Sequence, residues 1–443
     1  MGKTKIVLIG AGSTSFGVNT LADLFTHRAR FRHSTIALCD LNAEKLSRMT
    51  RLAERLNAAT DANYKIESAT DYRSVLRGAE FIFVSVEVDR LERWKLDWQI
   101  PLKYGIKHVL GENGGPGGLA HALRTIDLVL GIARDVEALA PNAYLINFTN
   151  PLTRVCLALT RYTRVKVIGM CHQINKGYSI VGQVLGLSPR TEAHFPEPST
   201  ANMLKAQLDL KTAGLNHVTW IQDIRERATG RDLYPEFLER LETFDPNFEP
   251  LSRRLYHAFG LFPTTGDDHV GEYFSYAYET SALAGYDFEG RELESAAQDQ
   301  QVERAGQVGA PLDEFLNWES GERGVNIASA ILNDLNEYEL TVNVENKGAL
   351  PGLPDWAIVE VPALVSGSGA IPLRMNPLPL AITAVLNQQV AIQDRVVEAA
   401  VHGDRQAALQ ALLLDPLITS YRVAEQLLDE LLEVHADYLP AFA

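Results

Sequence analysis

The sequence predicts an α/β protein with a doubly wound parallel sheet in its N-terminal part and an α+β part behind it. Up to Gly169, short apolar runs alternate with helix-compatible stretches, as the strands and helices of a parallel sheet do. The first run ends in a glycine turn, Gly10-Ala-Gly12, and the alternation stops after Pro189. Because 443 residues exceed what one hydrophobic core usually supports, we expect two domains, residues 1–190 and 191–443.

Five apolar runs predict the strands of the parallel sheet. Strands that are buried on both faces are typically near-continuous apolar runs bounded by turn residues. The stretch Phe16–Phe25 behind the first run is helix-compatible, so the chain begins with a strand, a turn and a helix. The five runs are Lys5–Gly10, Thr35–Asp40, Glu80–Val86, Ala143–Asn147 and Val165–Gly169.

The second part of the chain has a different pattern. Gln207–Gly214 is predicted as a strand, and Pro235–Phe259 as a long helical stretch. Leu, Ala and Val recur at i, i+3, i+4 spacing in Pro379–His402 and in Tyr421–His435, which predicts two amphipathic helices. Such helices pack in a core or between subunits, so we expect a homo-oligomer, either a dimer or a tetramer.

Charge and composition argue against several classes of protein. The net charge is −15 and the chain has no long run of Lys and Arg, whereas nucleic-acid binders carry a basic face. No stretch approaches the ~20 apolar residues of a membrane span, and Met1–Lys5 lacks the charged-then-apolar pattern of a signal peptide. The 3 cysteines have no paired spacing, which favours a reducing compartment. We expect a cytoplasmic protein that binds neither nucleic acid nor membranes.

The glycine turn predicts a dinucleotide site. Gly10 permits the turn, Gly12 lets the backbone approach a pyrophosphate, and Ser15 stands where a third small residue packs helix against strand. Asp40, at the end of the second run, would accept from both ribose hydroxyls and repel a 2′-phosphate, so NAD is expected rather than NADP. The alternatives are a turn that binds nothing and, for Asp40, a helix N-cap. The predicted cofactor-binding residues are Gly10, Gly12, Ser13, Thr14, Ser15 and Asp40.

Three polar clusters follow predicted strand ends, where ligands collect in open α/β sheets. Gly111–Gly118 holds five glycines and a proline, which suggests backbone shaped around a ligand. Asn147–Pro151 holds two carboxamides that could bind sugar hydroxyls or order a turn, and taken alone a turn is the simpler explanation. The third cluster, Gly169–Gln173, contains Cys171 and His172.

Cys171 could cooperate with His217 of the segment Gly214–His217 in a metal site. A thiolate and an imidazole can hold a transition metal in an open site. Spacing alone is a poor metal signature here, because the two residues are far apart in the chain and most buried cysteines act as small hydrophobes.

Together and in order, the motifs resemble glycoside hydrolase family 4, whose NAD-dependent members depart from two-carboxylate glycosidase chemistry. The likeness extends over nearly the whole chain, and it implies a fold similar to that of lactate and malate dehydrogenases. Each motif is common, whereas the ordered set is specific. The matching segments are Ile9–Thr14, Gly114–Gly118, Ala122–Ile126, Asn147–Pro151, Cys171–His172, Gly214–His217, Val342–Gly348 and Val359–Pro362.

The resemblance implies roles for individual residues. Cys171 and His217 correspond to the family's metal ligands, usually for Mn²⁺, and Glu112 to a carboxylate that tunes the catalytic base. Asn113 and Asn150 are expected beside the sugar, together with His217. These roles come from the resemblance and not from the spacing of the residues.

The residue at position 172 bears on the substrate and on the acid. Members that act on 6-phosphorylated glucosides tend to carry Asp where this chain has His172. The chain is therefore similar to the branch that takes unphosphorylated α-glucosides, α-galactosides or uronides. His172 is expected to protonate the departing oxygen.

Of the roles that the resemblance implies, the catalytic base has the least direct counterpart in this sequence. Many members use a Tyr, but the corresponding segment here is Phe262–Tyr273. We expect Asp268 to be the base, with Asp267 and Tyr273 as further candidates. The alternative is that the acidic pair belongs to a solvated turn or to a helix N-terminus.

The resemblance implies hydrolysis by oxidation and elimination. NAD⁺ would take the hydride from carbon 3 of the sugar, the metal would stabilise the resulting enolate, and the base would remove the carbon-2 proton before the aglycone leaves. Water addition and hydride return would complete the cycle. The alternatives are a plain NAD-dependent dehydrogenase of the lactate/malate type, acting on a sugar or hydroxy acid, and a non-catalytic module that senses the nucleotide.

Overall fold

One continuous sheet organises the chain in the computed structural model, which describes residues 3–191, 198–280, 286–316 and 320–442. Six neighbouring strands are parallel, in the order β3-β2-β1-β4-β5-β6. Doubly wound dinucleotide-binding folds have this order, so the predicted parallel sheet is confirmed. The strands are β1 (Lys5–Ile9), β2 (Thr35–Cys39), β3 (Lys65–Ala69), β4 (Phe81–Val84), β5 (Tyr144–Asn147) and β6 (Lys166–Gly169).

Alternate side chains of the parallel strands fill two hydrophobic cores, one on each face of the sheet. Val7 and Ile9 of β1 lie in the core that includes residues of α6, α7 and α16, whereas Ile6 and Leu8 lie in the core that includes residues of α1, α3 and α15. Each strand is thus buried on both sides, as parallel sheets require. The helices are α1 (Phe16–Thr26), α3 (Ala43–Ala59), α6 (Gly115–Leu139), α7 (Leu152–Tyr162), α15 (Gly324–Leu332) and α16 (Leu380–His402).

Strand β3 lies at the edge of the sheet and was not predicted. None of the residues Lys65–Ala69 is buried, because only β2 pairs with this strand. A strand without a buried face has no apolar run or clean alternation for sequence analysis to detect.

Antiparallel strands extend the same sheet beyond β6. β9 joins β6 through the pair Gly169↔Asn343, and β10 joins β7 through the pair Glu360↔Gly214. The sheet therefore continues across residue 190, and the division of the chain into two domains there stays a prediction. The strands are β7 (Leu208–Leu215), β8 (Val218–Glu226), β9 (Glu337–Glu345), β10 (Ile358–Ser366) and β11 (Gly369–Pro372).

The prediction of one long helical stretch over Pro235–Phe259 is wrong, because the helix is interrupted. The structure has two helices there, α10 (Tyr234–Thr243) and α11 (Pro250–Phe259). α10 ends where Phe244 adopts an extended conformation with ψ 168°, Glu249 is left-handed with φ 48°, and Pro250 begins the new helix.

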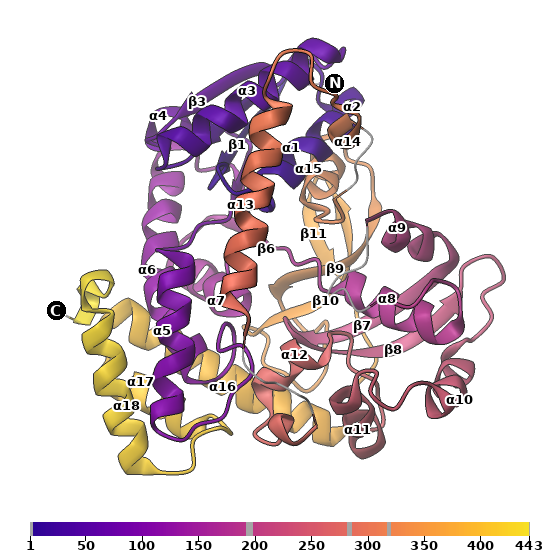
Figure 1. Cartoon of the computed structure of the whole chain (residues 1–443), viewed down its shortest axis with the longest axis vertical. Helices are drawn as coiled ribbons and strands as arrows, with labels where there is room; N and C mark the ends of the chain where they lie inside the picture. Colours follow the sequence, from indigo (N-terminus) through magenta and orange to yellow (C-terminus); the bar gives the residue numbers. More distant parts are fainter. Residues whose placement is uncertain (1–2, 192–197, 281–285, 317–319, 443) are drawn as a thin grey trace.

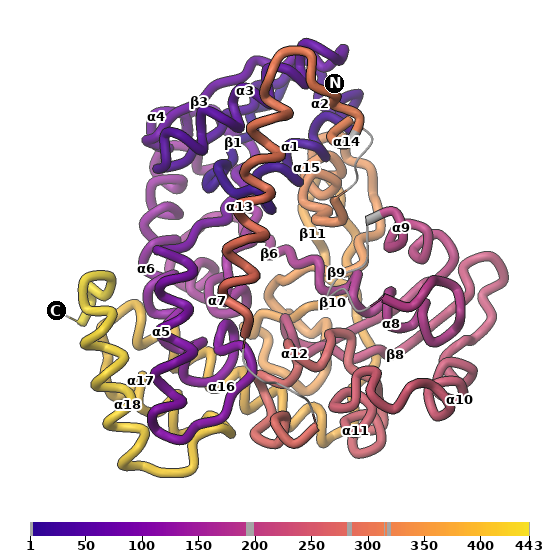
Figure 2. The backbone as a smooth tube through the Cα atoms, viewed as in Figure 1, coloured from indigo at the N-terminus to yellow at the C-terminus, as the bar shows by residue number. Residues whose placement is uncertain are grey.

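The C-terminal helices pack on the parallel-sheet part of the chain. α16 contacts α6 and α7, and α18 (Tyr421–Val434) contacts α5 (Arg90–Lys103), as Figures 1 and 2 also show. The two predicted amphipathic helices are confirmed. α17 (Arg405–Leu414), which was not predicted, lies between them. The Asp404 side chain caps its N-terminus by accepting from the N–H groups of Gln406 and Ala407.

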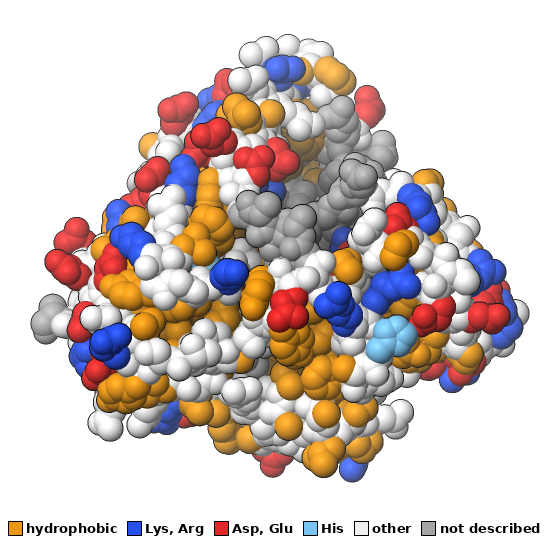
Figure 3. Space-filling model, turned by 60° about the horizontal axis from the view of Figure 1, so that its bottom comes forward, with side chains coloured by type: hydrophobic (Ala, Val, Ile, Leu, Met, Phe, Trp, Pro, Cys, Tyr) orange, Lys and Arg blue, Asp and Glu red, His pale blue; other side chains and the backbone are white. Residues whose placement is uncertain are grey.

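The remaining helices are short, apart from α5, α8 and α13, and α13 runs lengthwise past α3 and α5 (Figure 1). None of the helices within the described ranges is long and apolar enough to cross a membrane. On the face shown in Figure 3, acidic and basic side chains are interspersed. These helices are α2 (Arg28–Phe31), α4 (Arg73–Leu76), α8 (Ile174–Leu185), α9 (Pro198–Gln207), α12 (Asp267–Val270), α13 (Phe288–Ala305), α14 (Asp313–Leu316), and the 3₁₀ helices η1 (Gly271–Tyr273), η2 (Ala277–Glu279), η3 (Ala436–Tyr438) and η4 (Pro440–Phe442).

Candidate active site

The carboxyl ends of the parallel strands lie at one edge of the sheet. The residue pairs Ile9↔Val84, Val84↔Asn147 and Asn147↔Gly169 align the last residues of β1, β4, β5 and β6. The glycine turn, the Asn147–Pro151 cluster and the Cys171–His172 pair follow these strands, so the sheet brings them to the same edge. The expectation that Gly111–Gly118 also follows a strand is wrong, because this segment follows α5 and continues into the start of α6.

The turn after β1 has the geometry expected of a nucleotide loop. Gly10 has φ +90°, and a Cβ there would lie 1.9 Å from the carbonyl oxygen of Ser85, so no other residue fits. Gly12 donates its N–H to Oδ2 of Asp40 at 2.8 Å, and a Cβ at Gly12 would lie 2.7 Å from that oxygen. Asn42, and not Asp40, is the N-cap of α3. The glycine turn and the carboxylate therefore adjoin each other, as dinucleotide binding requires.

The role predicted for Ser15 is wrong. Ser15 is exposed, whereas a Cβ on Gly17 would lie 2.1 Å from the carbonyl oxygen of Ala11, so Gly17 is the residue that permits close packing of helix and strand. Ser13 Oγ accepts from the N–H of Phe16 at 3.2 Å and caps the first turn of α1.

Thr14 connects the nucleotide loop with α13. Its hydroxyl donates to Oε1 of Gln298 at 3.1 Å, across 284 positions of the chain. α13 is further joined to α3 by the Arg51–Glu303 ion pair at 2.8 Å. α13 thus lies against the loop where the pyrophosphate is expected.

The predicted metal ligands are brought together. Cys171 Sγ, after β6, lies 3.6 Å from Nε2 of His217, which stands in the turn between β7 and β8. Bonds of ~2.3 Å to sulfur and ~2.1 Å to nitrogen at a tetrahedral angle would place these atoms ~3.6 Å apart, so the pair fits one shared cation. Burial raises the pKa of the Cys171 thiol to about 12, and metal coordination deprotonates such a thiol.

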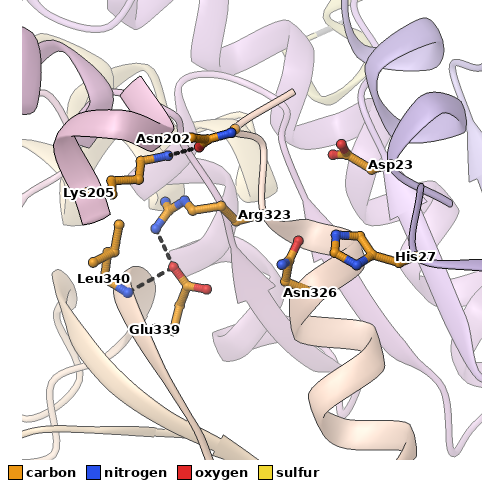
Figure 4. A pocket seen from close by; sticks show the side chains of 9 residues that line it. Asp23, His27, Asn202, Lys205, Arg323, Asn326, Glu339 and Leu340 are labelled. Carbon is orange, nitrogen blue, oxygen red and sulfur yellow. Dashed lines mark hydrogen bonds and ion pairs between the residues drawn. The ribbon is translucent and has the colours of Figure 1, made fainter. Parts of the chain in front are cut away.

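Arg323 fixes the backbone at Cys171. Its Nη2 donates to the carbonyl oxygen of Cys171 at 2.8 Å, and its Nη1 is bonded to the buried Glu339 carboxylate of β9. Arg323 and Glu339 also line a cavity of about 180 Å³ (Figure 4). A guanidinium with two fixed partners leaves the Cys171 loop little freedom to move.

His172 is paired with a carboxylate that the sequence did not reveal. Its Nδ1 lies 3.1 and 3.2 Å from the two oxygens of Glu322, a buried residue 150 positions further along the chain. Although burial opposes it, the charge and hydrogen bond of His172 lower the pKa of Glu322. An ionised carboxylate at Nδ1 orients the imidazole, the arrangement by which proton-transferring histidines are held.

The two adjacent aspartates of the predicted base segment have different partners. Both oxygens of Asp267 accept from the first turn of α11, from the N–H of Leu251 and of Ser252 at 2.7 Å each. Burial, with the nearby Glu249 carboxylate, raises the pKa of Asp267 to about 7. Asp267 therefore serves as a helix-terminal acceptor, the alternative considered for this pair.

Asp268 is linked to the metal pair through one imidazole. Its Oδ1 lies 3.3 Å from Nδ1 of His269, whose ring packs edge-on against the ring of His217 with centroids 4.4 Å apart. Burial lowers the pKa of His269, but the Asp268 carboxylate outweighs it and raises that pKa to about 9. Tyr273 is buried, and its hydroxyl donates to the carbonyl oxygen of Asn216 at 3.4 Å.

A buried carboxylate joins the base segment to the glycine-rich loop. Oε2 of Glu272 accepts from three consecutive N–H groups, those of Glu112 and Asn113 at 2.8 Å and that of Gly114 at 3.0 Å. Burial, followed by repulsion from Glu112, raises the pKa of Glu272 to about 7. The loop that carries two predicted site residues is thus shaped around a protein carboxylate.

Glu112 and Asn113 are themselves buried and connected. Asn113 Nδ2 donates to Oε2 of Glu112 at 3.1 Å, and Arg90 Nη2 donates to Oε1 at 3.2 Å. Asn150, half-buried, precedes a cis peptide bond to Pro151 at the end of the β5 loop. The carboxylates Glu272, Glu322 and Glu360 were missed, because each has a partner at least 144 positions away and such pairs leave no local pattern.

Known proteins were compared with the chain. Residues 5–187 match the model described as Family 4 glycosyl hydrolase, and residues 212–418 match its C-terminal domain. An alpha-glucosidase of Erwinia rhapontici is 33% identical over 98% of this chain and 99% of its own length. An alpha-galactosidase of Bacillus subtilis is 27% identical, with 99% of both chains covered.

Solved structures agree in fold. The crystal structure of a 6-phospho-alpha-glucosidase from gut microorganisms, in complex with NAD and Mn²⁺, matches with TM-score 0.82 at 23% identity, covering 100% of both chains. A lactate dehydrogenase from a deep-sea metagenome matches more distantly, with TM-score 0.52 at 13% identity over 90% of this chain and 100% of its own. The family models over most of the sequence and the 33% identical relative show that the chain belongs to glycoside hydrolase family 4.

Proposed function

We propose that this chain hydrolyses an unphosphorylated glycoside, an α-glucoside, α-galactoside or uronide, with NAD and a divalent cation such as Mn²⁺ as cofactors. The observation that carries the proposal is the 3.6 Å separation of Cys171 Sγ and His217 Nε2. The pair lies after β6, on the sheet edge that also carries the glycine turn at Gly10 and Gly12. One edge thus offers donors for a cation and a loop for a dinucleotide.

The nucleotide would be held by the turn after β1. Gly10 and Gly12 keep side chains out of the turn, and Asp40 offers acceptor oxygens to ribose hydroxyls. The cation would be held by Cys171 and His217. When bound, NAD supplies a hydride acceptor for carbon 3 of the sugar and the cation supplies positive charge near the oxygens of carbons 2 and 3.

The chain's own residues would then bind the sugar and move protons. Asn113 and Asn150 would orient the sugar hydroxyls. A carboxylate oxygen of Asp268 would take the proton from carbon 2, and Glu112, 7% exposed, would add negative charge nearby. His172, oriented at Nδ1 by Glu322, would donate a proton to the departing glycosidic oxygen.

The absence of a phosphate on the substrate is supported by two observations. The Erwinia rhapontici relative, 33% identical, is named an alpha-glucosidase. His172 stands where an aspartate is expected in enzymes for 6-phosphorylated glucosides, and its Nδ1 is engaged by Glu322.

The proposal is tested by turnover in heavy water. The purified protein is incubated with NAD⁺, Mn²⁺, a thiol reductant and a panel of nitrophenyl glycosides and uronides in D₂O. We expect cleavage of one of them with deuterium at carbon 2 of the released sugar, because the carbon-2 proton is removed and replaced from solvent. Cleavage without deuterium incorporation would contradict the proposed base chemistry.

Cys171→Ser provides the matched variant. The serine hydroxyl is a poor ligand for a transition metal, so turnover should be lost while NAD⁺ affinity, measured by fluorescence titration, stays within about twofold. Net accumulation of NADH with a sugar or hydroxy acid would instead favour a dehydrogenase. Turnover by protein freed of both NAD and metal would refute the proposal.

We further propose that the protein is a cytoplasmic homo-oligomer, a dimer or a tetramer. All 3 cysteines are free, as in a reducing compartment. Leu380 of α16 and Tyr421 of α18 are 85% and 59% exposed, which suits an interface. A single species at about 49 kDa in light scattering would refute the oligomer.

A further inference from the structure

Glu360 occupies the centre of a row of residues that crosses the sheet. The aligned pairs are Gly169↔Asn343, Asn343↔Glu360 and Glu360↔Gly214. Cys171 follows Gly169 by two positions on one side of the row, and His217 follows Gly214 by three positions on the other. Glu360 therefore lies between the two strands that lead to the predicted metal ligands.

Few residues pair between neighbouring strands on both sides of this row. β6 and β9 share the single register pair at Gly169, and β10 and β7 share the single pair at Glu360. Backbone hydrogen bonds along long ladders therefore do not fix the loop at Cys171 relative to the turn at His217. Side-chain contacts have to supply that constraint.

The Glu360 carboxylate binds three carboxamides, each from a different segment. It accepts from Nε2 of Gln173, from Nδ2 of Asn216 at 2.8 Å and from Nδ2 of Asn343 at 3.0 Å. Glu360 is 1% exposed, and its three donors are also buried. A buried carboxylate with several neutral donors is costly to remove, because each donor would be left unsatisfied.

The acceptor-only character of a carboxylate fixes the orientation of Gln173. An amide can present either its NH₂ or its oxygen, but a carboxylate admits only the NH₂. The Gln173 oxygen is thereby directed to the N–H of His217, from which it accepts at 2.9 Å. Glu360 thus reaches His217 through Gln173, and also through Asn216, the preceding residue.

The backbone at His217 needs such support. His217 has φ +67°, an uncommon conformation for a residue with a side chain, and it persists only where neighbouring groups hold it. The Gln173 oxygen holds the His217 N–H, and Thr265 Oγ1 donates to the His217 carbonyl oxygen at 3.1 Å.

We propose that Glu360 is a positioning residue that sets the Cys171–His217 pair at the separation one divalent cation needs. It acts through Gln173 and Asn216, and among the described residues its carboxylate makes no hydrogen bond to either ligand. This inference rests on the proposed function for the identity of the cation site, and extends it to a residue on another strand.

The test is Mn²⁺ affinity, measured by electron paramagnetic resonance of free Mn²⁺ without NAD or substrate. Glu360→Gln keeps the size of the side chain but turns one of its two acceptor oxygens into an NH₂. That NH₂ faces the Gln173 NH₂ at the Oε1 position, or the Asn216 and Asn343 NH₂ groups at the Oε2 position. We expect its Mn²⁺ Kd to rise 10- to 100-fold, the range for residues that orient metal ligands. The NAD⁺ Kd should change by less than about twofold, since the glycine turn lies beyond β4 and β5.

Asp415→Asn is the matched control. Asp415 is a carboxylate at 5% exposure that accepts from backbone N–H groups, those of Leu417 at 3.0 Å and of Gly115, and none of the four residues of the row bonds to its side chain within the described ranges. The control should retain the wild-type Mn²⁺ Kd even if its thermal midpoint falls. If Glu360→Gln fails to fold, Asn343→Ala removes one of the three donors, and its Kd should rise by several-fold.

The outcomes separate this inference from the proposed function. Folded Glu360→Gln or Asn343→Ala that binds Mn²⁺ with the wild-type Kd would overturn the inference, whatever the enzyme cleaves. A wild-type protein that bound no Mn²⁺ would overturn it too. Weaker Mn²⁺ binding by Glu360→Gln, in a protein that cleaved no glycoside, would support the inference and refute the proposed reaction.

Discussion

Replacing Glu272 by glutamine should change how the stability of the protein depends on pH. Oε2 of Glu272 accepts from the N–H groups of Glu112, Asn113 and Gly114, whereas Oε1 has no hydrogen-bond partner within the described residues. A glutamine can keep its oxygen on the three N–H groups and place its NH₂ at the other position. Glu272→Gln therefore preserves the contacts and removes the ionisation.

The magnitude follows from the pKa of Glu272, which burial and Glu112 raise from 4.5 to about 7. The unfolded chain releases this proton near pH 4.5, but the folded protein retains it up to about pH 7, so the folded state loses stability as pH rises between these values. At about 1.4 kcal/mol for each unit, ionised Glu272 costs about 3 kcal/mol above pH 7. The variant does not incur this cost.

Urea unfolding of the metal-free and nucleotide-free protein between pH 4.5 and 8 is the assay. The stability of Glu272→Gln relative to the wild type should increase by about 3 kcal/mol across that window. Asp267, whose pKa is also raised, titrates in both proteins and cancels in the difference. Glu236→Gln is the control: its half-buried carboxylate has a pKa lowered by Arg231, so the difference curve should be flat above pH 5. Parallel curves for Glu272→Gln and the wild type would refute the reasoning.

Three further predictions concern single substitutions and their controls. Gly12→Ala should raise the NAD⁺ Kd at least tenfold in fluorescence titration, because the new Cβ would lie 2.7 Å from Asp40 Oδ2. Gly131→Ala is its control, because a Cβ there meets no atom within 4 Å. It should leave the NAD⁺ Kd unchanged and stabilise α6 by about 0.5–1 kcal/mol. Asp268→Asn should lower kcat by about 10²- to 10⁴-fold, and it should also lower the thermal midpoint because it removes the carboxylate that keeps His269 protonated. Asp267→Asn should destabilise the protein by about 1 kcal/mol and keep kcat within about tenfold, so a 10²-fold loss of kcat in Asp267→Asn alone would assign the base to Asp267. Asp97→Asn leaves the buried Arg124 guanidinium without its carboxylate, so the free energy of unfolding should fall by about 3–5 kcal/mol. A decrease of less than about 1 kcal/mol in urea unfolding would contradict this argument from burial.

The nucleotide side of the fold could be predicted because its determinants are local. Val7 and Ile9 on one face of β1 and Ile6 and Leu8 on the other need only apolar side chains in consecutive positions. The close-packing role at the start of α1 was assigned to Ser15 by motif spacing. The structure gives it to Gly17, because where the helix begins, and not the spacing, decides which residue faces Ala11.

The roles of the two aspartates at 267 and 268 could not be predicted from their order. The choice depends on α11, which begins at Pro250 and presents the N–H groups of Leu251 and Ser252 to Asp267. The sequence analysis treated this region as one continuous helix, so it contained no free helix N-terminus that would engage either carboxylate. The error in secondary structure and the open question about the base thus have one cause.

The carboxylates that sequence analysis missed have a physical feature in common. Glu272 binds successive backbone N–H groups, and Glu360 binds carboxamides, so neither requires a cationic residue that would mark the pairing in the sequence. Each has a carboxyl oxygen that accepts these hydrogen bonds and thereby dictates the orientation of donors on another segment. Glu112, expected to be catalytic, and His217, expected to be a metal ligand, lie on the segments thus oriented. Local motifs therefore identify the candidate reactive groups. The distances between these groups are set by buried acceptors. The donors to these acceptors are backbone N–H groups and carboxamides, which are too frequent in any sequence to mark the pairing.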